Sequence, residues 1–340
     1  MKRIVVGFGM ISLLHPAWAH HSQAEFDTSI VHELEGEIVS IHWANPHVEI
    51  GLSITGADGT EELWELESQD INSLGRRGVS RDLVAIGQIV RAAGFVSTRQ
   101  DHFMSTTNML LPSGTEIRLR GNTQPRWKEE GVGFTNWVTN QPTVANDDSG
   151  LFRVWTKTET NPLRFNGEPP LTAAAFASQA AYDPLEDDPI AGCRAAGMPR
   201  AITSSGPHPL EFSERGDTII LRLETFDNVR VIHMAPNASA DGEPATPLGY
   251  STGRWEGNTL VVETTLIDWP YIDVVGLATV QQSDGLHLEE RFTLSEDDSE
   301  LVYDITLTDA ATFTEPVTAN RYMIWRWQPG VEIQPFDCEA

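Results

Sequence analysis

The chain has 340 residues, 40% of them hydrophobic, and its 23 Lys and Arg residues against 49 Asp and Glu residues give a formal net charge of -26. So acidic a protein repels phosphate backbones and anionic lipid surfaces, which argues against nucleic acid as a partner. The length exceeds what one hydrophobic core usually organises, so two domains are expected.

The first residues have the features of a cleaved secretory signal. Lys2 and Arg3 precede an apolar run over 4–14, and an Ala-Trp-Ala triplet ends at Ala19. That run is shorter than the roughly 20 residues of a membrane span, and no later segment is long and apolar enough to be one. We therefore expect residues 1–19 to be a signal peptide and the mature protein to be periplasmic or secreted.

Residues 20–121 predict a small β domain. Apolar and polar residues alternate over 48–54, as in a strand with one buried face. Residues 70–78 indicate one or two helical turns with Asp70 as the N-cap. Four or five strands with one small helix fit a barrel of the OB type. Strands are expected over 48–54, 62–67, 87–96 and 116–120.

Residues 122–191 predict an irregular connector. Pro, Asn, Thr and Asp become frequent there, and tryptophans such as Trp155 stand singly between turn residues. Scattered tryptophans attach a connector to a surface more often than they line a pocket. Within the connector, the Ala-rich stretch 171–182 predicts a short helix with Thr172 near its start.

Residues 192–340 predict a second, larger β domain. Short strands follow one another at spacings that tight turns can bridge, which favours an antiparallel lipocalin-like barrel, with a sandwich as the alternative. The predicted fold class is therefore mainly β, with a small OB-like barrel followed by this larger domain. Its strands are expected over 218–226, 229–234, 259–265, 287–294, 301–308 and 321–327.

The two cysteines, Cys193 and Cys338, belong to a segment predicted to be exported. An oxidising compartment favours a disulfide between them, which would tie the end of the chain to the start of the second domain. The alternative, a redox or metal-binding thiol pair, has no Cys-x-x-Cys spacing to support it.

Four histidines near the predicted mature start are candidate metal ligands. Cleavage after Ala19 would give His20 both a free amine and an imidazole, a bidentate arrangement that suits copper, with His21 beside it. His42 and His47 flank an Asn-Pro turn that can bring them toward the chain start. Copper or zinc is the cofactor hypothesis. The alternative is a hydrated N-terminus with two surface histidines, since no standard metal-binding spacing is present.

Glu290 is the most unusual residue of the second domain. By alternation it points into the apolar interior, where an ionised carboxylate is costly unless it is paired. The candidate partners are Arg222, Arg230 and His233. An inward carboxyl group with Arg230 and His233 suggests a general acid or base. A buried Arg–Glu pair that fixes strand register is the preferred alternative, because no nucleophile motif accompanies it.

The N-terminal half resembles a family of exported bacterial proteins known only as domain of unknown function 6152. Its hallmarks stand here as Ala19-His20-His21-Ser22, Phe26-Asp27 and Trp43-Ala44-Asn45-Pro46-His47, and the resemblance covers about residues 19–121. The second half looks like uncharacterised exported β-rich proteins, in its stretches 193–200, 253–265 and 290–292. The resemblance implies no established activity, but it makes the matching histidines natural site candidates.

Three functions remain open from the sequence. The first is an exported two-domain β protein that binds a small ligand or an envelope protein. The second is a copper or zinc protein, or a metal-dependent enzyme, that uses His20, His21, His42 and His47. The third is a lyase or isomerase that acts through Glu290 and His233.

Overall fold

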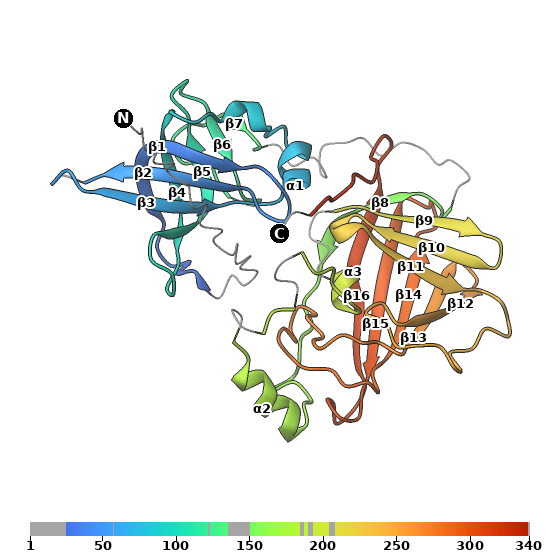
Figure 1. Cartoon of the computed structure of the whole chain (residues 1–340). Coiled ribbons are helices and arrows are strands. Elements are labelled where there is room, and N and C mark those ends of the chain that lie inside the picture. Colours follow the sequence, from blue (N-terminus) through green and yellow to red (C-terminus); the bar gives the residue numbers. More distant parts are fainter. Residues whose placement is uncertain are drawn as a thin grey trace, which may run out of the picture.

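The computed structural model describes residues 25–56, 58–121, 123–134, 150–183, 187–189, 193–203 and 208–338. These residues form sixteen β-strands and three α-helices, arranged as two barrels with separate hydrophobic cores (Figure 1). The predicted signal peptide lies outside them. Among the helices of this described part, none has the length and apolar character that crossing a membrane requires.

The first barrel is a ring of five strands in the order β1-β2-β3-β5-β4. A closed ring with an odd number of strands cannot be antiparallel throughout, and here β3 and β5 form the parallel pair. The predicted OB-like barrel is confirmed. The strands are β1 (His32–His42), β2 (Glu49–Thr55), β3 (Glu61–Glu67), β4 (Ile89–Val96) and β5 (Phe103–Leu110), extended by β6 (Glu116–Arg118) and β7 (Gly131–Val132).

Helix α1 (Ile71–Arg76) lies between β3 and β4 in sequence. It begins where predicted, because the Asp70 carboxylate accepts a hydrogen bond from the Ser73 amide at 2.7 Å and so caps an otherwise unpaired N–H group. Leu74 is fully buried in the core of the first barrel. The N-cap and the packing of Leu74 and Ile71 on this core hold the helix on the first barrel.

The second barrel is a closed ring of nine strands in the order β10-β11-β12-β13-β14-β15-β16-β8-β9. Because the ring is closed, the predicted barrel is confirmed and the alternative, a sandwich, is wrong. The antiparallel prediction holds for every pair except β11 and β12, which are parallel; an odd ring again requires such a pair. The strands are β8 (Val154–Thr160), β9 (Leu210–Arg215), β10 (Thr218–Leu223), β11 (Asn228–His233), β12 (Tyr250–Glu256), β13 (Thr259–Thr265), β14 (His287–Leu294), β15 (Glu300–Thr308) and β16 (Val317–Trp327).

The region 122–191 is less irregular than the sequence predicted. Its residues Val154–Thr160 form β8, which pairs with β16 on one side and β9 on the other. The expectation of an irregular connector is wrong there, because the β-branched residues around Trp155 favour a strand. The Trp155 ring is fully buried inside the barrel. The predicted helix is present as α2 (Ala173–Ala181), capped by the Thr172 hydroxyl, and a short α3 (Arg200–Thr203) follows.

Aromatic side chains pack together inside the second barrel. The Phe292 ring lies 5.2 Å from that of Phe212 and 4.9 Å from that of Tyr303, and Trp155 and Trp325 are fully buried. Interior positions of a small barrel are commonly filled by side chains in this way. This part of the interior is therefore packed core.

The C-terminal end of the chain lies between the two barrels, beside α1 (Figure 1). The predicted disulfide is confirmed, with Cys193 and Cys338 joined at 2.08 Å and 145 positions apart in sequence. Asn45 of the first barrel forms an isolated parallel bridge with Cys338. The crosslink therefore fixes a segment that contacts both barrels.

We expect Cys338→Ser to lower the free energy of unfolding by about 2–5 kcal/mol, because the loss of the crosslink enlarges the ensemble open to the unfolded chain. Urea unfolding followed by tryptophan fluorescence measures this. Cys193→Ser should give the same loss, and the double variant should add nothing further. Equal stability of the wild type with and without a reductant would contradict the prediction.

Candidate functional site

The carboxylate of Glu290, on β14, lies inside the second barrel with Arg230 of β11. Arg230 Nη1 donates to Glu290 Oε1 at 3.0 Å, and Nη2 donates to Oε2. The Tyr303 hydroxyl donates to Glu290 Oε1 at 2.9 Å. The Glu290 side chain is 0% exposed and that of Arg230 is 1% exposed. The structure thus places two of the predicted residues, Glu290 and Arg230, in one bidentate ion pair.

Arg230 makes two further hydrogen bonds inside the barrel. Its Nε donates to the Ser251 hydroxyl at 3.0 Å, and Nη2 donates to the Thr264 hydroxyl at a shorter distance. Burial, together with the charge of Glu290, raises the pKa of Tyr303, so its hydroxyl stays protonated and donates. A buried pair bonded in this way connects the five consecutive strands β11 to β15 and holds them in register.

His233 does not join this network. It lies on β11 three residues after Arg230, and the alternation of that strand turns it to the opposite face. Its ring stacks on Tyr250, with centroids 4.6 Å apart and planes inclined by 11°. The predicted trio of Glu290, Arg230 and His233 is therefore split, since the histidine lies outside the barrel wall.

The predicted metal ligands are only partly described. His20 and His21 lie outside the described residues. His42 is exposed at the end of β1, whereas His47 is half-buried, with Nδ1 3.1 Å from the Ser68 carbonyl oxygen. Burial lowers the pKa of His47, which keeps its imidazole neutral. The described residues contain no group of three His, Cys, Asp or Glu side chains that could hold a metal ion, and the metal site stays a prediction.

A buried charge cluster that sequence reasoning missed joins the two barrels. His208 lies between the carboxylates of Asp70 and Glu224, with Nε2 3.5 Å from Asp70 and Nδ1 3.1 Å from Glu224. Arg76 of α1 makes a bidentate ion pair with the same Glu224. Asp70 and Arg76 lie at the two ends of α1, whereas His208 and Glu224 lie far along the chain and share no motif with them. Only the fold brings these four side chains together.

The charges of this cluster shift its pKa values. Burial alone lowers the pKa of His208, but the carboxylates of Asp70 and Glu224 outweigh burial and raise it to about 9. Burial raises the pKa of Glu224, but hydrogen bonds from His208 and Arg76 outweigh that effect and lower it to about 2. At neutral pH the cluster therefore holds charged partners, which attach the second barrel to α1.

The C-terminal segment completes the contact between the barrels. The Gln334 amide donates to Glu224 Oε2 at 2.8 Å, and the Asn72 side chain donates to the Pro335 carbonyl at 3.1 Å. Phe336 packs edge-on against the His208 ring at 5.6 Å. The cluster and the disulfide together make this region a structural joint.

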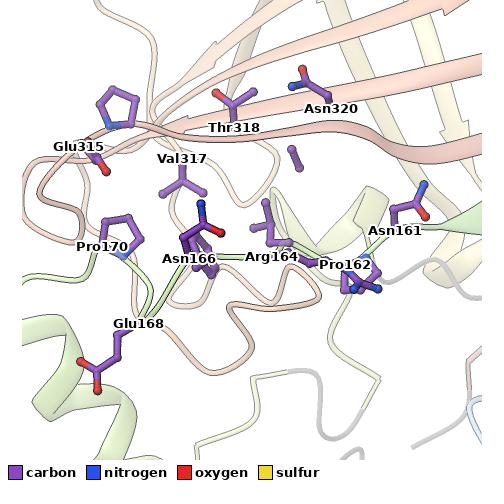
Figure 2. A pocket seen from close by; sticks show the side chains of 14 residues that line it. Asn161, Pro162, Arg164, Asn166, Glu168, Pro170, Glu315, Val317, Thr318 and Asn320 are labelled. Carbon is purple, nitrogen blue, oxygen red and sulfur yellow. The ribbon is translucent and has the colours of Figure 1, made fainter.

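A groove of about 630 Å³ lies on the second barrel, and no residue of the joint lines it. Figure 2 shows the side chains that form its walls. One wall is the segment 161–170, which follows β8, and the other is the segment 315–320, which contains the start of β16. The side chains of Arg164, Glu168 and Glu315 are exposed here. In volume the groove falls within the range of ligand sites, roughly 300–1,000 Å³.

The groove carries polar groups with unused hydrogen-bonding capacity. Within the described part of the chain, the carboxamides of Asn166 and Asn320 make no hydrogen bond, and the three charged side chains make no ion pair. Sequence reasoning did not identify this site. The signal in the sequence is the density of Asn and Pro over 161–170, which also suits an ordinary connector.

The comparisons with known proteins agree with the N-terminal resemblance. Residues 9–102 match the family model described as a family of unknown function, DUF6152. No curated protein matches the chain. The resemblance of the second half stays a prediction.

We expect Glu290→Leu or Arg230→Leu alone to cost about 3–5 kcal/mol, because each leaves the other charge buried and unpaired. The double variant should recover most of that loss, as measured by urea unfolding. Arg222→Leu on the neighbouring strand is the control, since Arg222 pairs with Glu211 on the exposed surface and should cost less than about 1 kcal/mol. Single variants as stable as the double variant would contradict a closed network.

The charge cluster predicts a stability that depends on pH. The folded pKa of His208 lies above its ordinary value of 6.5, so its contribution is complete below pH 6.5 and is lost as the pH rises through about 9. We expect a decline in the free energy of unfolding of about 3 kcal/mol over that window, because one pKa unit corresponds to about 1.4 kcal/mol. The Glu224 contribution is complete above its ordinary value of 4.5 and is lost as the pH falls through about 2. Urea unfolding across pH measures both.

His208→Gln is the matched control for the alkaline window. It keeps a side chain of similar size and removes the titration, so the decline between pH 6.5 and 9 should disappear. If the free energy of unfolding of this variant still falls between pH 6.5 and 9, groups other than His208 cause the decline.

Proposed function

We propose that the protein is an exported binding protein whose ligand site is the groove between the segment 161–170 and the start of β16. The observation that carries this proposal is the combination of volume and polarity: about 630 Å³ with carboxamide and charged groups that lack partners inside the described chain. Such groups gain hydrogen bonds when a polar ligand enters.

The packed interior of the second barrel favours a ligand site on the outside of the barrel over one at its centre. The interior carries the satisfied ion pair of Arg230 and Glu290 among packed aromatic rings. Histidine His233, the general acid or base that the enzyme hypothesis pairs with Glu290, lies on the opposite face of β11. This arrangement favours a binding role over a lyase or isomerase.

Export is supported by the residues that hold the fold together. The disulfide between Cys193 and Cys338 forms a covalent part of the joint, and disulfides persist in oxidising compartments. The leader pattern ahead of Ala19 agrees with passage into such a compartment. Both features support the proposal that the mature protein is periplasmic or secreted.

Native mass spectrometry of the protein isolated from the periplasm of the producing cells tests both parts of the proposal. We expect a polypeptide mass that lacks residues 1–19 and a second species that carries a retained ligand. Thr318→Trp should remove the ligand-bound species, because Thr318 is exposed in the groove and a Trp side chain there fills it.

Val229→Trp is the matched control. Val229 is close to threonine in size, is exposed on β11, and does not line the groove. This variant should keep the ligand-bound species. Equal retention by all three proteins, or a wild type without any bound species, would refute the groove as the ligand site, and an intact leader would refute export.

A further inference from the structure

One wall of the groove is a strand edge without a strand partner in the described structure. β15 pairs with the first half of β16 through Val317, Thr318 and Ala319. On the other side of β16, β8 pairs only with Met323–Trp327. In an antiparallel ladder, alternate residues turn their N–H and C=O groups away from the partner strand. The edge over 317–320 therefore presents such groups to the groove.

A backbone irregularity ends the pairing with β8 at this point. Arg321 has a φ of 50°, in the left-handed region, and the register of β15 with β16 shifts beside it. The Arg321 amide donates to the Asp304 carboxylate at 2.6 Å. The strand is thus bent where β8 leaves it, which separates a covered half from an uncovered half.

The segment 161–170 runs along the uncovered half and is tied at its two ends. The Asn161 amide donates to the Tyr322 carbonyl at 2.7 Å, and the Thr314 amide donates to the Pro170 carbonyl at 2.8 Å. Between these ties, the Leu163 amide donates to the Val275 carbonyl and so points away from β16. The segment is held at a distance from the edge, and the groove is the space between them (Figure 2).

A covering loop alone does not explain this arrangement. Proteins often protect a strand edge by packing a loop on it. Here Pro162 and Pro170 lack the N–H groups that would pair with β16. The segment does not pack on the edge, because a groove of about 630 Å³ lies between them. Because the segment 161–170 is hydrogen-bonded at both ends, it leaves no room for the edge of a second folded sheet beside β16. A single extended chain fits the space that remains.

Charge distinguishes the two ends of the groove. Figure 2 shows Glu168 and Glu315 at one end, and Asn161 and Asn320 at the other. The two carboxylates have no ion pair within the described residues. A basic side chain of a ligand would find its complement at the Glu168 end.

We propose that the groove binds an extended segment of a partner polypeptide, which adds as a strand to the edge of β16 over Val317–Asn320 and places a basic residue at the end of the groove where Glu168 and Glu315 lie. The edge spans roughly 13 Å, which about four residues of extended chain match. Main-chain hydrogen bonds supply affinity in such strand addition, and side-chain contacts supply specificity. This inference rests on the proposed function and names the ligand class of the same site.

The test uses a library of hexapeptides of random sequence displayed on phage and selected against the full chain. The strongest binder is synthesised with blocked ends, once unmodified and once with N-methyl groups on alternate backbone nitrogens. We expect N-methylation of the nitrogens that face β16 to weaken binding at least tenfold. We also expect the unmodified peptide to slow amide hydrogen exchange, measured by NMR, at alternate positions of Val317–Asn320.

Charge variants test the orientation of the peptide. Glu168→Gln combined with Glu315→Gln should weaken binding of a Lys- or Arg-containing peptide about tenfold. The control combines Glu243→Gln with Glu296→Gln, two exposed acidic residues outside the groove, and should leave affinity within about twofold. Equal weakening by both pairs would assign the effect to net charge and overturn the basic-residue part of the inference.

The outcomes separate this inference from the proposed function. If Thr318→Trp abolishes peptide binding but N-methylation of the peptide has no effect, the groove is still the binding site and strand addition is overturned. A library that yields no binder at about 1 mM overturns the polypeptide ligand, whereas a ligand retained in native mass spectrometry still supports the groove. Peptide binding that Thr318→Trp does not change overturns the site itself.

Discussion

β8 closes the second barrel, and its length decides how much of the barrel wall is paired. β8 is the strand that connects β16 to β9 and completes the ring, yet it has seven residues and β16 has eleven. A shorter strand cannot cover the whole of its neighbour. The ring therefore closes over Met323–Trp327 and leaves the first half of β16 with an open edge. The groove follows directly from this mismatch in length.

Closure also decides what the barrel interior can contain. Water is scarce inside a packed ring, so a carboxylate there must find its partners within the protein. Glu290 does so through Arg230 and Tyr303, and the guanidinium also donates to the Ser251 and Thr264 hydroxyls. These groups are already bonded to one another, which is why the proposed binding site is the groove on the outside of the barrel.

The sequence predicted those features that depend on local pattern. Period-two alternation placed Glu290 inside the barrel, and the capping chemistry of Asp70 placed α1. β5 was missed because its strand buries polar residues such as Ser105 and Asn108 on both faces, so no alternation is visible. The groove and the His208 cluster were missed because they arise where segments distant in sequence meet, and no spacing along the chain records that.

The Trp-x-Asn-Pro-His segment shows how a motif noticed for its histidine can act through another residue. Asn45 is fully buried. Its side-chain oxygen Oδ1 accepts a hydrogen bond from the Ile71 amide at 2.9 Å, and its side-chain nitrogen Nδ2 donates to Asn72 Oδ1 at 3.0 Å and to the Phe336 carbonyl. The same side chain thus fixes the start of α1 and the C-terminal segment. Residues 9–102 match the family model, whereas Phe336 lies far beyond it. In this chain, the motif therefore connects the OB-like barrel to the domain that follows, and a structural role accounts for its asparagine without a metal.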